Sequence, residues 1–120
     1  MAKKILVVDD DPGNVLMLES FLKDRGYTVV IANDGEEAVH KAKAQMPDLI
    51  LLDIMMPKMD GTEVAVVLKE DANTRHIPIF YLTAVITAED RVERIGASNI
   101  IFPKPVNFNE LLEHIKQRIG

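Results

Sequence analysis

The sequence predicts an α/β domain in which helices cover both faces of a five-stranded parallel sheet. Short apolar runs that are rich in β-branched residues and lack alternating polar positions are typical of strands buried on both faces. They occupy residues 5–8, 29–31, 49–52, 77–82 and 100–102. Segments with helical spacing separate these runs. This alternation favours parallel strands that are joined by right-handed crossovers.

Helix signals identify the first two connecting segments. Apolar residues from Val15 to Leu22 recur at helical spacing, and Gly26 suits the left-handed conformation that ends a helix. Asp34 followed by Glu37 matches a capping box, which predicts the start of a second helix.

Three further helices are expected in the second half of the chain. The third, around residues 64–68, is rich in valine, so its outer side is expected to be apolar as well. Thr87 is a suitable cap for a short fourth helix through Val92 and Ile95. A second capping box at Asn107 predicts a final helix with one apolar face.

Length and composition favour one small cytosolic domain. The 120 residues are enough for a single core, and an apolar share of 48% is typical of globular proteins. No apolar run approaches the ~20 residues that span a bilayer, and the first apolar run is too short for a signal peptide. The absence of cysteine excludes disulfides and thiolate chemistry. A net charge of −5 argues against direct nucleic-acid binding.

Polar residues lie directly after, or within two residues of, the ends of four predicted strands. Asp9 and Asp10 follow the first strand, Asp53 the third, Thr83 the fourth and Lys104 the fifth. The carboxyl ends of parallel strands share one edge of the sheet, where open α/β folds bind ligands. We therefore expect these side chains to lie together.

Each of these residues also has an ordinary structural explanation. Asp11 is best explained as a cap of the first helix, Asp53 alone resembles a turn former, and Lys104 alone resembles a solvated charge. The group is harder to explain in this way, because neighbouring carboxylates repel one another unless a cation lies between them. Oxygen ligands without histidine or cysteine, with room for water, favour Mg²⁺ over Ca²⁺.

The combination of groups indicates phosphoryl chemistry. A carboxylate beside Mg²⁺, a lysine and a threonine hydroxyl is arranged to receive a phosphoryl group, because the cations neutralise its oxygens while the carboxylate attacks in line. The sequence has no Gly-rich phosphate loop, so the donor is not expected to be ATP bound to this chain.

Four motifs together resemble the receiver domain of bacterial two-component response regulators. They are "ILVVDDDP", "LILLDIMMPKMDG", "IPIFYLTA" and "FPKP", in this order and spacing. The resemblance implies one receiver domain over residues 1–120, with a doubly wound five-stranded sheet of flavodoxin-like order 2-1-3-4-5. It also implies a stand-alone signalling protein that catalyses only its own phosphorylation and dephosphorylation.

The resemblance also assigns roles to the residues at the predicted edge. Asp53 would accept the phosphoryl group. Asp10, Asp53 and the backbone carbonyl of Met55 would ligate Mg²⁺, while Asp9 would hold a metal-bound water.

The remaining roles concern the response to phosphorylation. Thr83 would be the switch hydroxyl, Lys104 would pair with the phosphoryl group, and the Lys104–Pro105 peptide would be cis. The implied partners are a sensor histidine kinase or phosphotransfer protein and a downstream protein target.

The sequence departs from the family pattern at the switch. Receivers usually have a tyrosine or phenylalanine three residues before the lysine, where this chain has Ile101. A shift in register would allow the adjacent Phe102 to take that place. This departure concerns how phosphorylation changes the surface, not the phosphorylation chemistry.

Two other functions are alternatives to this one. A metal-dependent phosphatase with an aspartyl nucleophile would carry a second aspartate where this chain has Met55, which cannot transfer a proton. A degenerate receiver that acts only as an interaction module would have lost the acceptor, the metal-binding acids or the lysine, and all of these are present.

Overall fold

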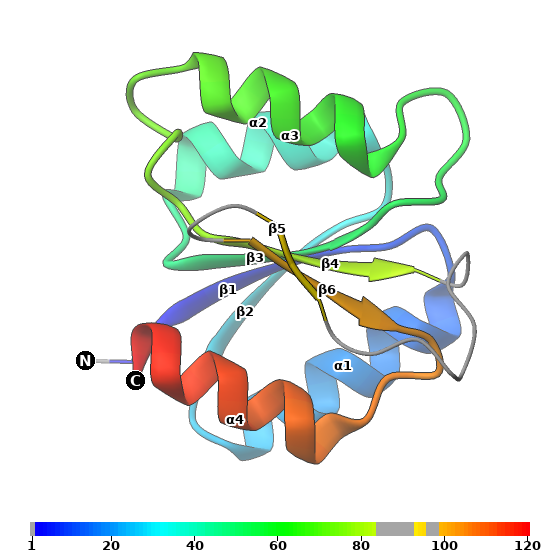
Figure 1. Ribbon diagram of the computed structural model, residues 1–120, viewed down its shortest axis with the longest axis vertical. Coiled ribbons are helices and arrows are strands. Elements are labelled where there is room, and N and C mark those ends of the chain that lie inside the picture. Colours follow the sequence, from blue (N-terminus) through cyan, green and yellow to red (C-terminus); the bar gives the residue numbers. More distant parts are fainter. Residues whose placement is uncertain (1, 84–92, 96–98) are drawn as a thin grey trace.

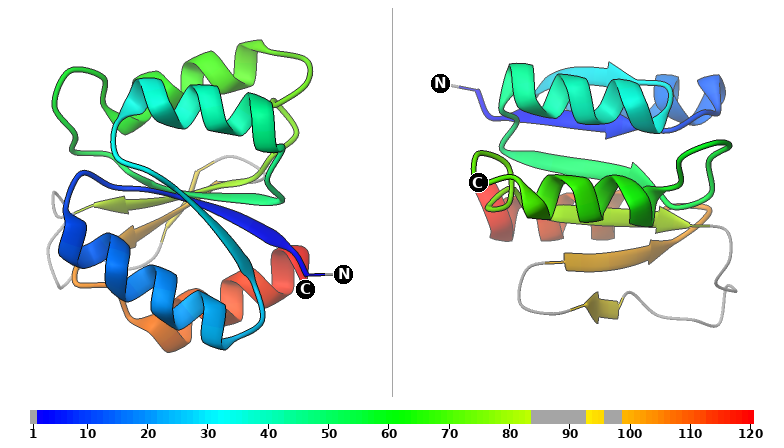
Figure 2. Two further views of the ribbon diagram at one scale, coloured as in Figure 1. Left: turned by 180° about the vertical axis from the view of Figure 1, so that it is seen from behind. Right: turned by 90° about the horizontal axis from the view of Figure 1, so that it is seen from above.

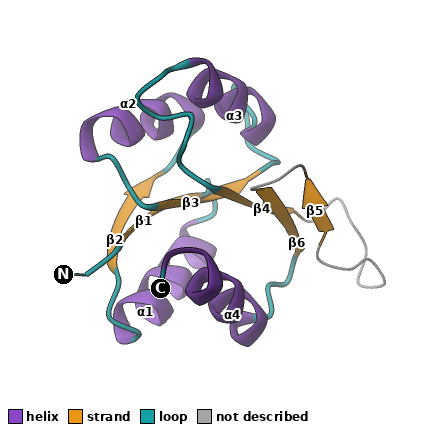
Figure 3. Cartoon of the chain, turned by 60° about the vertical axis from the view of Figure 1, so that its left-hand side comes forward, coloured by secondary structure: helices purple, strands orange, loops and turns teal. Residues whose placement is uncertain are grey.

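A central sheet separates two pairs of helices in the computed structural model, which describes residues 2–83, 93–95 and 99–120 (Figure 1). The elements in chain order are β1 (Lys4–Val8), α1 (Pro12–Asp24), β2 (Thr28–Ala32), α2 (Gly35–Gln45), β3 (Leu49–Asp53), α3 (Gly61–Glu70), β4 (Ile79–Thr83), β5 (Glu93–Ile95), β6 (Asn99–Pro103) and α4 (Phe108–Ile119). Helices α2 and α3 cover one face of the sheet, and α1 and α4 cover the other (Figure 3). Within these ranges no helix has the length and apolarity needed to cross a membrane.

The strands are ordered β2-β1-β3-β4-β6-β5 across the sheet (Figure 2). Neighbours from β2 to β6 run parallel, which confirms the predicted order 2-1-3-4-5 with β6 as the fifth parallel strand. The register places Asp53 opposite Leu82, and Thr83 opposite Pro103. The carboxyl ends of the parallel strands therefore meet along one edge.

Two apolar clusters, one on each face of the sheet, form the core. Leu6 and Val8 of β1 face α2 and α3, whereas Ile5 and Val7 face α1 and α4. All four side chains are fully buried. Because successive strand residues point to opposite faces, a strand covered on both sides needs apolar residues at every position. This requirement explains why uninterrupted apolar runs in the sequence predict the strands.

The predicted helix boundaries at α2 and α4 are confirmed by their capping hydrogen bonds. The Glu37 backbone N–H donates to Asp34 Oδ1 at 2.8 Å, and the Glu110 N–H donates to Asn107 Oδ1 at 3.1 Å. Gly26, two residues after α1, has a φ of 91°. Such a left-handed conformation is one that glycine adopts without a steric penalty. The predicted end of the first helix is also confirmed.

The outer side of α3 is mixed rather than apolar, because Thr62, Glu63 and Glu70 are exposed beside one valine. Val64 and Leu68 are buried against the sheet, whereas Val66 is 56% exposed.

The prediction of a fourth helix through Ile95 is wrong. Residues Glu93–Ile95 form β5, which pairs antiparallel with the outer edge of β6. Thr87 and Val92, which were expected in the same helix, lie outside the described residues. A few apolar residues do not determine a helical period. Pairing with β5 also satisfies backbone groups on the outer edge of β6.

Phe102 does not take the place of the aromatic residue expected at position 101. Ile101 lies opposite Tyr81 and packs into the cluster beneath α2 and α3. Phe102 points to the other face, where its ring centroid lies 5.4 Å from that of Phe80 and 5.3 Å from that of His114. Neighbouring strand residues cannot share a face without a bulge, so the expected substitution by a register shift is wrong.

Candidate functional site

The polar residues predicted to gather at the sheet edge do lie at the ends of adjacent strands. Asp9 directly follows β1, Asp53 and Thr83 are the last residues of β3 and β4, and Lys104 directly follows β6. The side chains of Asp9, Asp53 and Thr83 are all buried. Burial of polar groups is unfavourable unless they are paired, so their partners determine what this edge can do.

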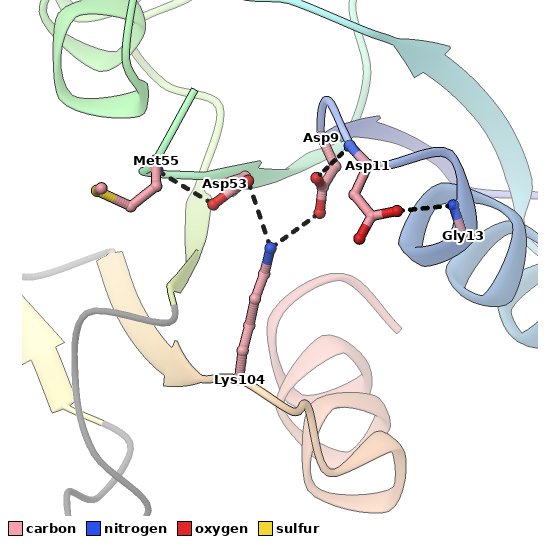
Figure 4. Close-up of polar contacts among 6 residues, drawn as sticks. All are labelled: Asp9, Asp11, Gly13, Asp53, Met55 and Lys104. Carbon is pink, nitrogen blue, oxygen red and sulfur yellow. Dashed lines mark hydrogen bonds and ion pairs between the residues drawn. The ribbon is translucent and has the colours of Figure 1, made fainter. Parts of the chain in front are cut away.

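Lys104 lies between the two buried carboxylates (Figure 4). Its Nζ is 3.1 Å from Asp9 Oδ2 and 3.3 Å from Asp53 Oδ2. These three residues are brought together from positions 9, 53 and 104 of the chain. One ammonium group thus partly balances two carboxylates that would otherwise repel each other at close range.

Backbone N–H groups bind the other carboxylate oxygens. The Asp11 N–H donates to Asp9 Oδ1 at 2.9 Å, and the Met55 N–H donates to Asp53 Oδ1 at 3.1 Å. Asp11 itself accepts from the Gly13 N–H at 2.9 Å as the N-cap of α1, which confirms its structural role. Each buried carboxylate is therefore held by Lys104 on one oxygen and by a backbone N–H on the other.

The carboxyl group of Asp53 has a raised pKa. Burial, followed by the charge of Asp9, raises the pKa of Asp53 to about 6. The charge of Lys104 and the hydrogen bonds from Met55 and Lys104 oppose this rise. At pH 7 the group is mostly ionised, yet poorly solvated, as is suited to a nucleophile.

Lys104 is affected in the opposite sense by the same neighbours. Its burial acts to lower its pKa, but the hydrogen bond and charge of Asp9, followed by those of Asp53, outweigh burial and raise the pKa of Lys104. The ammonium form is therefore maintained at neutral pH.

Three carboxylates at the edge are close enough to share one cation. One oxygen each from Asp9, Asp10 and Asp53 lies within 4.8 Å of the others, with Asp10 exposed and the other two buried. An oxygen-only set with one side open to water fits a hard divalent ion such as Mg²⁺. The residues present therefore fit the predicted metal.

Met55 and Thr83 both contact neighbouring residues of the site through their backbones. The Met55 side chain is 60% exposed and points away from Lys104, so its backbone is the part of the residue that touches the site (Figure 4). The Thr83 carbonyl accepts from the Lys104 N–H at 2.9 Å. The Lys104–Pro105 peptide is cis, as the family resemblance implies.

An apolar cleft next to the carboxylates was not predicted from the sequence. It has a volume of about 400 Å³ and is lined by Asp9, Asn14, Met17, Leu18, Leu82, Lys104, Pro105, Val106 and Phe108. Most of its lining comes from α1 and from the segment between β6 and α4, which are far apart in the chain. Only the proximity of "FPKPV" to the acidic motif in the folded sheet could have indicated it.

Comparisons with known proteins agree with this geometry. The chain is 34% identical over 122 residues to the polar-differentiation response regulator DivK of Brucella species and covers 98% of that protein. It is 45% identical over 109 residues to the response regulator PleD of Caulobacter vibrioides, covering 89% of this chain but only 24% of PleD. It therefore spans about a quarter of the length of that relative.

Solved structures with the same fold include the receiver domain of the sensor histidine kinase PA1611 from Pseudomonas aeruginosa. The TM-score is 0.86 at 33% identity, with 100% of this chain and 99% of that chain covered, and that structure has a magnesium ion coordinated in its active-site cleft. The chemotaxis protein CheY4 of Vibrio cholerae matches with a TM-score of 0.85 at 30% identity over 99% of this chain and 100% of that chain.

A sequence model of the response regulator receiver domain matches residues 5–116, nearly the whole chain. Together with the DivK relationship and the carboxylate–lysine arrangement at the sheet edge, this match shows that the chain belongs to the response regulator receiver domain family of two-component signal transduction.

Proposed function

We propose that the domain, residues 1–120, accepts a phosphoryl group on Asp53 from a phosphohistidine of a histidine kinase or phosphotransfer protein. The observation that carries this proposal is the contact of one ammonium, Lys104 Nζ, with the buried carboxylates of Asp9 and Asp53 beside a third carboxylate. A partly buried lysine held between acids at the carboxyl edge of a sheet is suited to binding a transferred anion.

In the proposed transfer, a carboxylate oxygen of Asp53 forms a bond to phosphorus as the bond from phosphorus to the donor nitrogen breaks. The histidine nitrogen leaves with the electron pair and can take a proton from water. The Met55 N–H keeps the Asp53 carboxylate oriented during the approach. Orientation of this kind can supply a large part of a rate enhancement.

Two side chains would respond to the new phosphoryl group. Lys104, 3.3 Å from Asp53, would exchange its carboxylate contact for a phosphoryl oxygen. Thr83, at the end of the adjacent strand β4, would donate a hydrogen bond from its hydroxyl to another phosphoryl oxygen. Movement of these groups would change the surface that a downstream protein recognises.

Asp10, Asp53 and the Met55 carbonyl would hold Mg²⁺, with Asp9 holding a metal-bound water. Mg²⁺, when bound, would supply charge neutralisation for the phosphoryl oxygens. The carboxylate cluster supports this assignment, as does the magnesium in the PA1611 receiver structure.

Exposed apolar residues near the site support a protein as the donor. Leu16 and Met17 of α1 are 65% and 55% exposed, and Met17 also lines the cleft beside Lys104. An exposed apolar patch beside a reactive group is typical of a site that another protein covers. The proposal includes a cytosolic location and no direct contact with nucleic acid or membrane.

The proposed function is tested by mixing the purified chain with acetyl phosphate and Mg²⁺. Intact-mass spectra are expected to show the addition of one phosphoryl group, and excess EDTA is expected to prevent it. An unmodified mass in Mg²⁺, with a known receiver domain phosphorylated in parallel, would contradict the proposal.

Asp10→Ala is expected to remove the stabilising effect of Mg²⁺. Without metal, loss of this carboxylate should leave the free energy of unfolding unchanged or slightly increased, because it relieves repulsion with Asp9 and Asp53. With Mg²⁺ at one hundred times the dissociation constant, the wild type should gain about 2.7 kcal/mol.

Thermal melts with and without Mg²⁺ measure both effects. Asp24→Ala removes an exposed aspartate at the end of α1 and should keep the full metal-induced shift. If Asp10→Ala and Asp24→Ala were stabilised equally by Mg²⁺, Asp10 would not be a ligand.

A further inference from the structure

Two helices that cover the same face of the sheet begin with the same pattern. At α2 and at α3 an aspartate is the N-cap, a glycine is the first helical residue, and a glutamate at the third position donates its N–H to the aspartate. The capping distances are 2.8 Å for Asp34 and 3.0 Å for Asp60. Residues 54–60, the loop between β3 and α3, touch both glycines.

Gly35 of α2 leaves no room for a side chain against this loop. A Cβ built on Gly35 would lie 2.7 Å from the Met59 carbonyl oxygen and 2.8 Å from Met59 Cβ. Contacts below 3.0 Å essentially never occur for real Cβ atoms, and a backbone oxygen cannot turn aside as a side-chain tip can. Any side chain at position 35 must therefore push the loop away from α2.

Gly61 holds the other end of the same loop. A Cβ there would lie 2.5 Å from the Asp53 carbonyl oxygen and 2.8 Å from Ile54 Cα. The Gly61 N–H also donates to the Ile54 carbonyl at 3.0 Å. Asp53 and the residue that follows it, Ile54, are thus packed directly on the first turn of α3.

The loop between these two contacts contains a strained turn. Lys58 has a φ of 68°, and the Met59 N–H donates to the Pro57 carbonyl at 2.8 Å, across a single residue. A γ-turn with a non-glycine residue at positive φ is an unfavourable conformation that persists only where the surroundings enforce it. The packing of Met59 on Gly35 is such an enforcing contact.

We propose that Gly35 is a positioning residue for the cation site of this domain. It provides the surface on which Met59 lies, and thereby fixes the loop that carries Met55 next to Asp53. Gly61 holds the loop at Asp53 and Ile54, where the loop begins. A displacement of Met59 must therefore be absorbed by the residues between Ile54 and Met59, and Met55 is one of them. This inference depends on the proposed binding of Mg²⁺ by Asp10, Asp53 and Met55.

Gly35→Ala is expected to weaken Mg²⁺ binding on the order of tenfold, as is usual when a group that orients metal ligands is lost. Isothermal titration of the protein with Mg²⁺ alone measures the dissociation constant. Amide chemical shifts in the metal-free protein should change at Met55 and Asp53.

Gly26→Ala separates site geometry from overall stability. Gly26 has a φ of 91°, and nothing lies within 4 Å of a Cβ built there. Alanine at this position should lower the melting temperature by about 4 °C through backbone strain. It should leave the Mg²⁺ dissociation constant unchanged.

Each outcome bears on a different claim. If the wild type does not bind Mg²⁺, the proposed function fails. If the wild type binds and Gly35→Ala binds equally well, the positioning role of Gly35 is wrong. If Gly35→Ala does not fold, Met59→Ala decides, because it removes the Met59 Cγ that lies 2.9 Å from the Cβ position of Gly35. That variant should weaken Mg²⁺ binding several-fold, and an unchanged affinity would overturn the inference.

Discussion

Asp53→Asn is expected to abolish stable uptake of a phosphoryl group from acetyl phosphate in the presence of Mg²⁺. The amide keeps the size of the side chain but removes the anionic oxygen that would form the bond to phosphorus. The fold should be retained, because the change removes one of two buried carboxylates that repel each other. Intact-mass spectra under conditions that phosphorylate the wild type measure the effect.

The matched control is Asp24→Asn, the same change at an exposed aspartate. It should be phosphorylated to the same extent as the wild type. Equal phosphorylation of Asp53→Asn and Asp24→Asn would show that the acceptor is another residue, and peptide mapping would then locate it.

Much of the fold could be predicted because its determinants are local. Strands buried on both faces have uninterrupted apolar runs, and the Asp34 and Asn107 caps form hydrogen bonds with residues three positions ahead. The strand at Glu93–Ile95 could not be predicted in this way. Its conformation depends on β6, which supplies the hydrogen-bonding edge.

The positions of the site residues could be predicted more completely than their contacts. Parallel strands bring Asp9, Asp53 and Lys104 to one edge, and this follows from the order of elements alone. The double contact of Lys104 with two buried carboxylates depends on the length and direction of a side chain. The close approach of Met59 to Gly35 likewise depends on a turn conformation that the motif "MPKMDG" does not specify.

Lys104→Met is expected to lower the free energy of unfolding by about 3 kcal/mol at pH 8 in EDTA. The change keeps the apolar stem but leaves Asp9 and Asp53 buried without a cation, and removal of one partner from a buried ion pair is costly. Removing one partner of a buried ion pair typically costs about 3–5 kcal/mol. The low end is expected here because the Lys104 side chain is 16% exposed. Urea denaturation measures it.

The loss of stability caused by Lys104→Met should become smaller as the pH falls. The pKa of Asp53 is about 6 in the folded wild type, against roughly 3.9 in an unfolded chain. Without the opposing charge of Lys104 the folded pKa rises further. Between pH 8 and pH 5 the folded state of the variant therefore binds a proton that the unfolded state does not, so its stability increases as the pH falls. The deficit relative to wild type should shrink accordingly by pH 5.

Two further variants separate the charge effect from lost packing. Lys23→Met breaks an exposed ion pair with Glu19, in which the lysine side chain is 57% exposed, and should cost less than about 1 kcal/mol without this pH dependence. The double variant Lys104→Met with Asp53→Asn leaves only the Asp9 carboxylate of this buried pair and should regain much of the stability at pH 8. A loss that is the same at pH 5 and pH 8, and that Asp53→Asn does not relieve, would mean that Lys104 stabilises the fold through its stem. Its ammonium group would then not be what holds the two carboxylates together.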